Sequence, residues 1–225
     1  MAEQDVDAAR LVQQHTGQVV GQLQREYLPA AGRTRPTSAA SATMAALRGA
    51  DPARLGDDPG VWALVWTDLD PRLQGRTDGP SDAEQAICAG LVLYAIHQQG
   101  RLTPMDLRGV SLGAAAGRLA RREGADGGLD PAVVRRFTAV ALARTSSQRL
   151  YHLRVFIKLL RSYDIGLDHA LLAADLFRMA RPERATRVRT GWARDLYSRP
   201  GEADDGSAPA DGAPPANDSS ENGAA

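Results

Sequence analysis

The stretch Ser146–Met179 constrains the fold most, because its first half is apolar around most of a helical circumference. Within residues 146–162, apolar side chains recur at i, i+3 and i+7 and fill further directions: Leu150, Leu153, Val155, Phe156, Ile157, Leu159 and Leu160. We expect neighbouring elements to enclose such a helix almost completely. One basic edge of the helix is expected to stay uncovered. It consists of Arg154, Lys158 and Arg161, which lie within roughly 60° of each other at about 100° per residue.

This basic edge has two interpretations. Three cations in a row repel one another on an isolated helix, which is tolerable where an anion lies along them. The alternative is that long basic side chains simply reach solvent from a packed interior, as charged stripes commonly do.

The second half of the stretch predicts a turn followed by another helix. Gly166 is expected to take a left-handed conformation at the turn, and Asp168 to cap the second helix. Two helices joined by so short a link pack as an antiparallel hairpin. Asp164 and Asp168 are interpreted as caps or as partners of Arg161, and not as catalytic groups.

Similar patterns predict helices along the rest of the chain. They cover residues 4–27, 38–48, 59–69, 81–99, 111–122, 131–144 and 182–199. Ser81 and Glu84 form a capping box, and Asp130 followed by proline marks a further helix start. No strand-like alternation of useful length occurs, so the predicted fold class is all-α, a compact bundle of about eight or nine helices.

We expect one helical domain over residues 1–199 and a disordered acidic tail over residues 200–225. The tail is rich in Pro, Gly, Ala, Asp and Ser and cannot bury enough apolar surface to become ordered.

The formal net charge of zero is a sum over segments that carry opposite net charges. Residues 1–100 carry 8 basic and 12 acidic side chains, residues 101–199 carry 19 and 9, and the tail carries six acids and no base.

The basic C-terminal half predicts a polyanionic partner. Of the 27 basic residues 26 are arginine, a bias that GC-rich coding also produces, so arginine identity alone carries little weight. Guanidinium groups bind phosphate oxygens bidentately without reading bases. The predicted nucleic-acid-binding residues are Arg48, Arg118, Arg121, Arg135, Arg136, Arg154, Lys158, Arg161, Arg184 and Arg187. Few exposed aromatic residues are expected, because the pair Trp62 and Trp66 is interpreted as core, so base stacking is not predicted.

No pattern predicts an active site. The single cysteine, Cys88, lies in an apolar helical pattern and is expected to be a buried thiol. His97 is interpreted as a cap at a helix C-terminus, where a proton is favoured. His152 and His169 flank the hairpin and, if they meet, are interpreted as packing. With no phosphate-binding loop and no metal-ligand spacing, we expect no enzyme, no metal and no cofactor.

The chain shows no signal peptide and no apolar run near the ~20 residues that span a membrane. We therefore expect a cytoplasmic protein that does not contact a membrane.

The order of elements resembles a known family. The run GVSLG at 109–113, an arginine-bearing helix, VVRRF, LYHLRVFIKLLRSYDIGLDHALLAADLF and a basic closing helix resemble the CasB family. These proteins are the small subunits of the type I-E CRISPR Cascade surveillance complex. The resemblance covers about residues 5–198 and is more specific in the C-terminal half. The sequence departs from the family in its Gly-rich 123–129 loop, its arginine-rich last helix and its acidic tail.

The resemblance implies a non-catalytic, all-helical subunit with two small lobes, about residues 1–100 and 101–199. It implies two copies arranged head to tail beside the backbone and large Cascade subunits, together with guide RNA and target DNA. Their basic faces would contact the target and displaced strands and stabilise the R-loop in antiviral defence. R-loop formation is a near-balanced exchange that protein contacts to the backbone can tip.

Two other functional classes stay open at this point. A helix-turn-helix regulator would need a recognition helix with polar, base-reading side chains. A protein-only adaptor would use its arginines against acidic surfaces of partner proteins.

Overall fold

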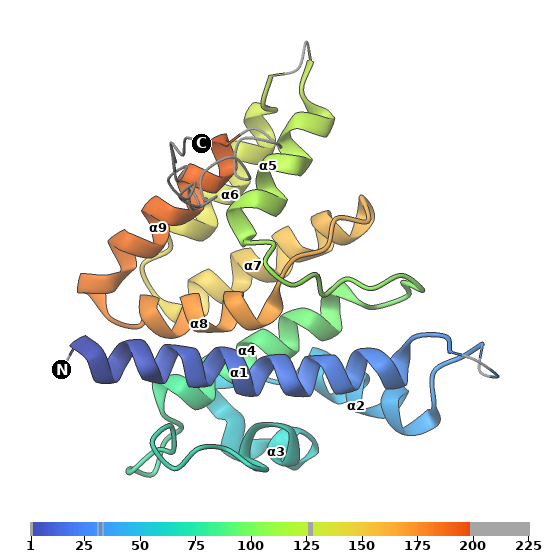
Figure 1. The fold of residues 1–225 in the computed structure, drawn as a ribbon, viewed down its shortest axis with the longest axis vertical. Coiled ribbons are helices and arrows are strands. Elements are labelled where there is room, and N and C mark those ends of the chain that lie inside the picture. The colour runs from blue at the N-terminus through green and yellow to red at the C-terminus, as the bar shows by residue number, and fades with distance from the viewer. Residues whose placement is uncertain (1, 31, 33, 126–127, 199–225) are drawn as a thin grey trace, which may run out of the picture.

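A computed structural model describes residues 2–30, 32, 34–125 and 128–198, with side chains from residue 7 onward. In this part the chain forms nine α-helices, one 3-10 helix and no strand (Figure 1). The elements are α1 (Ala2–Tyr27), α2 (Ser38–Gly49), η1 (Pro52–Asp57), α3 (Pro59–Trp66), α4 (Asp82–His97), α5 (Leu112–Glu123), α6 (Pro131–Leu142), α7 (Ser146–Ser162), α8 (His169–Met179) and α9 (Pro182–Tyr197). The all-α prediction is confirmed, whereas the predicted disordered tail, residues 200–225, lies outside the described residues.

Helices α1, α4 and α8 pack against one another in the middle of the molecule. In Figure 1, α1 and α8 run side by side, with α3 on one side of them and α5, α6 and α9 on the other. Helix α8 comes from the C-terminal half of the chain and yet packs on α1 and α4 from the N-terminal half. The division into two lobes near residue 100 stays a prediction.

Helix α4 is the enclosed helix of this fold. Between Ala83 and Gln98 every residue except Gln85 is buried. The capping box starts it as predicted: the Ser81 hydroxyl accepts from the Glu84 amide at 3.1 Å, and the Glu84 carboxylate accepts from the Ser81 amide at 2.7 Å. The predicted burial of the Cys88 thiol in this helix is confirmed as well.

The lack of a side chain at Gly90 lets α4 cross its neighbours closely. A Cβ atom at this position would lie 2.9 Å from the Cβ of Ala173 on α8 and 3.1 Å from the methyl group of Thr16 on α1. The three central helices therefore meet at one point where only glycine fits.

The expectation that α7 is nearly enclosed is wrong. The helix buries Leu153, Phe156 and Ile157, but Tyr151 is 66% exposed and Val155 is 48% exposed. Helix α6 packs on one side of α7 and α4 on another, and these two neighbours leave one stripe uncovered. Composition alone cannot show how many sides of an apolar helix will be covered.

The turn between α7 and α8 differs from the prediction in one detail. Asp168 caps α8 as expected, but Asp164 (φ 55°), and not Gly166, takes the left-handed conformation. Gly166 is needed for a different reason, since a Cβ there would lie 2.7 Å from the side chain of Leu107. Asp164 pairs with Arg101 at 3.0 Å and not with Arg161.

The tryptophan pair on α3 belongs only partly to the core. The Trp62 and Trp66 rings lie 5.9 Å apart, and Trp66 is half-buried with its indole N–H donating to Glu84. Trp62 is 40% exposed, and its indole N–H donates to the carbonyl of Leu55 at 3.0 Å. The prediction of a core pair is wrong for Trp62, because α3 is a short helix whose outer side meets solvent.

The histidines also lie differently from expectation. His97 is fully buried, and its Nδ1 lies 3.1 Å from Nε2 of His169, whose Nδ1 lies 2.9 Å from the Asp106 carboxylate. Burial, and then the charge of His169, lower the pKa of His97 well below its usual value, so the predicted protonated cap is wrong. The suggested meeting of His152 and His169 is wrong too, since the His152 ring contacts Tyr151.

Candidate nucleic-acid interface

Five of the ten predicted contact residues are exposed cations. They are Arg118 on α5, Arg135 and Arg136 on α6, Lys158 on α7 and Arg187 on α9. None of the five forms a hydrogen bond or an ion pair with another described residue, so their charges face solvent. We call Arg135, Arg136 and Lys158, which belong to the packed pair α6 and α7, the basic face.

The α6–α7 hairpin carries no acid at all. Residues 131–162 contain seven basic side chains and no aspartate or glutamate. The two helices are held together by apolar contacts, among them the rings of Phe137 and Phe156 at 6.0 Å. No carboxylate belongs to the hairpin itself, so its own side chains carry a net positive charge, and Asp130, which caps α6, and Glu123 on α5 lie at its edge.

Helix α5 adds a further cation where it meets α6 and α7. Arg136, Glu123 and Tyr163 are among the residues that line a hollow of about 170 Å³. The Arg122 guanidinium lies 5.3 Å from the centre of the Tyr163 ring and donates to the Tyr163 carbonyl at 2.8 Å. The Tyr163 hydroxyl donates to Glu123, and this hydrogen bond raises the pKa of the phenol. Arg122 was not among the predicted contact residues, although its position one turn after Arg118 could have indicated it.

Two residues of the predicted basic edge are bound to helix ends. The two terminal nitrogens of Arg154 donate to the carbonyls of Arg48 and Ala50, at 3.0 and 2.8 Å. Arg161 donates to the carbonyl of Ile96 at 3.0 Å. These carbonyls belong to the C-terminal ends of α2 and α4, which lack partners within their helices and carry partial negative charge.

These contacts explain how the three cations are tolerated on α7. The partial negative charges of two helix ends face Arg154 and Arg161, so the helix needs no external anion to hold them. Lys158 has no such partner among the described residues and is exposed. The contact with Arg154 also brings half-buried Arg48 to the edge of α7, although the sequence places the two residues far apart.

The remaining candidates differ in accessibility. Arg121 turns toward α9, where it donates to the carbonyl of Leu196 at 3.3 Å. Arg184 is half-buried on α9, and Arg187 is exposed one turn further on. Whether each of these side chains touches nucleic acid stays a prediction.

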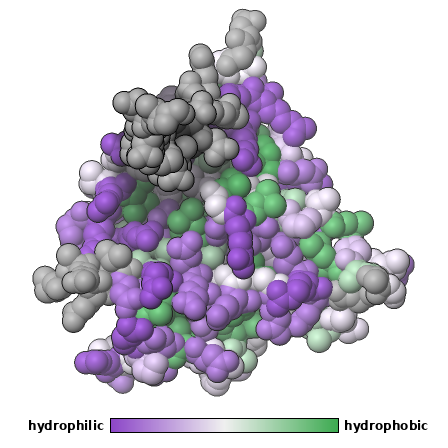
Figure 2. Space-filling view, in the orientation of Figure 1, coloured by the Kyte–Doolittle hydropathy of each residue, from purple (hydrophilic) through white to green (hydrophobic). Residues whose placement is uncertain are grey.

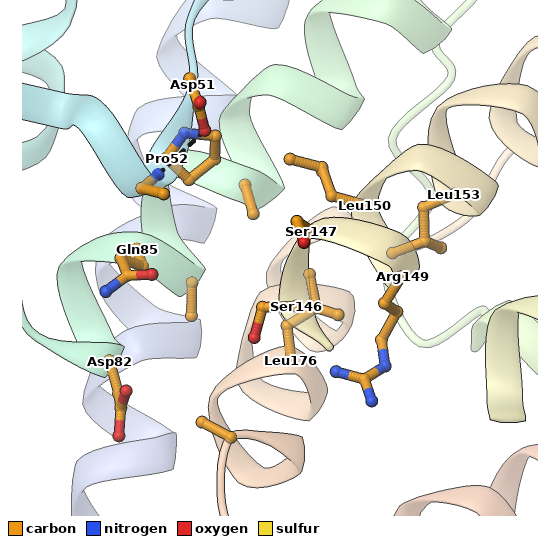
Figure 3. A pocket seen from close by; sticks show the side chains of 14 residues that line it. Asp51, Pro52, Asp82, Gln85, Ser146, Ser147, Arg149, Leu150, Leu153 and Leu176 are labelled. Carbon is orange, nitrogen blue, oxygen red and sulfur yellow. Dashed lines mark hydrogen bonds between the residues drawn. The ribbon is translucent and has the colours of Figure 1, made fainter. Parts of the chain in front are cut away.

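A separate pocket of about 90 Å³ lies among η1, α4, α7 and α8 (Figure 3). Its lining includes the carboxylates of Asp51 and Asp82, which oppose a phosphate group. Arg149 also lines the pocket, but it is buried and donates to the carbonyl of Ala143 at 2.7 Å. We therefore do not assign this pocket to nucleic acid. No cluster of three or more potential metal ligands occurs among the described residues.

On the face in Figure 2, polar residues cover most of the surface and hydrophobic residues form scattered patches. In the described part of the chain, no helix has the length and apolar character needed to cross a membrane.

Comparison with known proteins identifies the fold. The family described as CRISPR-associated protein Cse2 (CRISPR_cse2) matches residues 43–197. The chain belongs to the Cse2 family. Among solved structures, CasB from Thermobifida fusca is similar to this Cse2-family chain with a TM-score of 0.62 and 30% sequence identity, over 85% of this chain and 98% of that chain. No curated protein sequence matches.

The Cse2 match confirms the resemblance to the CasB family of type I-E Cascade. The matched region, 43–197, includes all ten predicted contact residues, from Arg48 to Arg187. The basic face is thus part of the Cse2-family domain and not of the segments that flank it.

Proposed function

We propose that this chain is a non-catalytic nucleic-acid-binding subunit of a type I-E Cascade complex. It stabilises the R-loop through sequence-independent contacts to the backbones of the target and displaced DNA strands, in antiviral defence. The observation that carries the proposal is the acid-free α6–α7 hairpin, whose exposed cations have no partner among the described residues of a Cse2-family fold.

Physical chemistry explains why such a surface suffices. Guide pairing supplies sequence recognition, and exchanging a DNA duplex for an RNA–DNA duplex is nearly balanced in free energy. Each cation that neutralises a phosphate releases counterions and favours the opened state. A few contacts that ignore sequence therefore shift the balance without disturbing recognition.

The contact residues fall into two groups. Arg118, Arg135, Arg136, Lys158 and Arg187 are exposed and present their full charge. The second group is half-buried and consists of Arg48, Arg121, Arg154, Arg161 and Arg184. These residues contribute through the guanidinium N–H groups that their intramolecular contacts do not use. A guanidinium group has five N–H donors, so two bonds to helix ends do not exhaust it.

The proposed partners are the backbone and large subunits of Cascade, guide RNA, target DNA and a second copy arranged head to tail. Charge supports the head-to-tail arrangement, because residues 1–100 carry an excess of acids and residues 101–199 an excess of bases. The proposed location is the cytoplasm, and no cofactor is part of the proposal.

The test compares guide-loaded Cascade assembled with and without this chain. Omission is expected to weaken target-duplex binding and R-loop stability, and adding the chain back to restore both. Equal affinity of the two assemblies, with the chain failing to join the complex, would contradict the proposal.

A protein-only adaptor makes a different prediction for Lys158, which is the only lysine of the chain. Acetylation by an amine-reactive reagent, read by mass spectrometry, reports on this one side chain. We expect Lys158 to become protected when target DNA is added to the assembled complex. Full protection on assembly, before any DNA is added, would contradict a contact between Lys158 and target DNA.

A further inference from the structure

Tyr151 is a large aromatic side chain that the fold leaves in water. It is 66% exposed on the outer side of α7, and its hydroxyl forms no hydrogen bond with another described residue. The ring touches His152 edge-on, with centroids 5.5 Å apart. Such a ring contributes little to the stability of the fold, so one face remains available to a ligand.

The neighbours of Tyr151 on α7 are apolar and cationic. Val155, one turn further on, is 48% exposed, and Lys158, two turns further on, is exposed. The three side chains lie within about 60° of each other around the helix, and Tyr151 and Lys158 lie about 10 Å apart along its axis. On the adjacent helix, Leu142 is 60% exposed.

Charge indicates which ligand fits this stripe. An exposed tyrosine with apolar neighbours suits either a protein or a nucleobase. Residues 131–162 hold no acid, and four of their seven bases are exposed, namely Arg135, Arg136, Arg144 and Lys158, which favours a ligand that carries negative charge. An aromatic platform beside cations that follow a backbone is the arrangement that binds single-stranded nucleic acid.

We propose that Tyr151 stacks against an unpaired nucleobase of the displaced DNA strand, whose phosphates run past Lys158. This inference rests on the proposed function. It adds a residue that contacts a base to a face whose other proposed contacts are made to phosphates. The displaced strand is the relevant one, because the bases of the target strand pair with the guide. Stacking accepts any base, so the contact remains independent of sequence.

The test uses guide-loaded Cascade and two targets that are already open over the guide-paired region. In one target the displaced strand is poly-dT, and in the other it is abasic throughout. Tyr151→Ala is expected to weaken binding of the poly-dT target about 5-fold or more and to leave binding of the abasic target unchanged. Tyr151→Phe is expected to keep wild-type affinity for both targets.

A matched control is available on α9, where Tyr197 is 63% exposed. Tyr197→Ala is expected to bind both targets as the wild type does.

Two results for Tyr151→Ala would overturn the stacking proposal. One is an equal loss of affinity for the poly-dT and the abasic target, because the effect would then not depend on bases. The other is wild-type affinity for both targets. If Arg135→Ala, Arg136→Ala and Lys158→Ala combined change binding of neither target, the proposed function itself fails. If that variant weakens both while Tyr151→Ala weakens neither, only the stacking proposal fails.

Discussion

Arg154 and Lys158 lie one turn apart on α7, and their surroundings give them different physical roles. Arg154 bridges two carbonyls at the end of α2, whereas Lys158 reaches solvent without a partner among the described residues. A planar guanidinium can serve two acceptors at once, which an ammonium group on a flexible stem does less well. The same positive charge therefore stabilises the fold at one position and stays available for binding at the other.

This difference predicts opposite outcomes in stability measurements. Arg154→Ala is expected to lower the free energy of unfolding by about 1.5–3 kcal/mol, because two charge-assisted hydrogen bonds are lost. Lys158→Ala is expected to change it by less than about 0.5 kcal/mol. Urea denaturation followed by circular dichroism measures both variants. Equal effects of the two substitutions would show that the bonds to the α2 carbonyls do not stabilise the fold.

The buried His97 predicts a dependence of stability on pH. Burial lowers its pKa in the folded state well below the ordinary value of 6.5. Above about pH 6.5 the ring is neutral in both states and adds nothing; below it, only the unfolded chain takes up the proton, and stability falls as pH falls.

The measurement compares wild type with His97→Gln by urea denaturation at pH 7.5 and pH 5.5. The variant is expected to lose less stability over this interval, by up to about 1.4 kcal/mol for each pH unit below 6.5. If the two proteins lose stability in parallel, protonation of His97 does not oppose folding.

The position of His97 near a helix C-terminus predicts a capping side chain that favours a proton, and this prediction is wrong because the side chain is buried. Its burial depends on His169 and α8, which come some seventy residues later in the chain. Sequence periodicity predicts the helix that carries a residue, but it does not predict which other helix will pack over that residue.

At the scale of elements, α5 and α9 approach closely through glycine. A Cβ atom at Gly113 would lie 2.2 Å from the carbonyl oxygen of Trp192, and one at Gly117 would lie 2.6 Å from that of Leu196. Both obstacles are backbone atoms, which cannot rotate away. The contact holds α9 in place, and the indole N–H of Trp192 then donates to Asp175 on α8 at 2.7 Å.

Gly113→Ala is therefore expected to lower the free energy of unfolding by about 2 kcal/mol or more. Gly191 on α9 provides the matched control, because a Cβ there meets nothing within 4 Å. Gly191→Ala is expected to stabilise the protein by about 0.5–1 kcal/mol through helix propensity. Thermal or urea unfolding of both variants checks the pair, and a neutral Gly113→Ala would refute the close approach.

The elements that sequence predicted well are those fixed by local chemistry. Side chains of Ser81, Asp130 and Asp168 cap the helices that they were expected to cap. The 3-10 helix η1 was missed, and α7 was expected to be the enclosed helix in place of α4. Which apolar helix lies in the middle depends on the packing of all the others, and no local pattern encodes it.

At the scale of the whole molecule, the net charge does not predict the candidate interface, because a net charge of zero conceals a hairpin that has no acidic residue. The sequence predicted the cations of the candidate interface but not their accessibility. Arg154 and Arg161 are bound to helix ends, and Arg122 lies over the ring of Tyr163, which lines a hollow together with Arg136. These distinctions arise from tertiary contacts between segments that are distant in the chain.

The central claim is that the basic face holds DNA through its phosphates. The most direct measurement is the salt dependence of target-DNA affinity for guide-loaded Cascade carrying wild type or the combined variant Arg135→Ala, Arg136→Ala and Lys158→Ala. Because these side chains are exposed, the variant is expected to fold normally.

The control removes the same number of exposed charges from the N-terminal half, by Arg10→Ala, Arg54→Ala and Arg76→Ala. The slope of log affinity against log salt is expected to become shallower by about 2 to 3 for the basic-face variant, since each phosphate contact adds about 0.7–0.9. The control is expected to keep the wild-type slope. A wild-type slope for the basic-face variant, or an equal change in the control, would contradict the account.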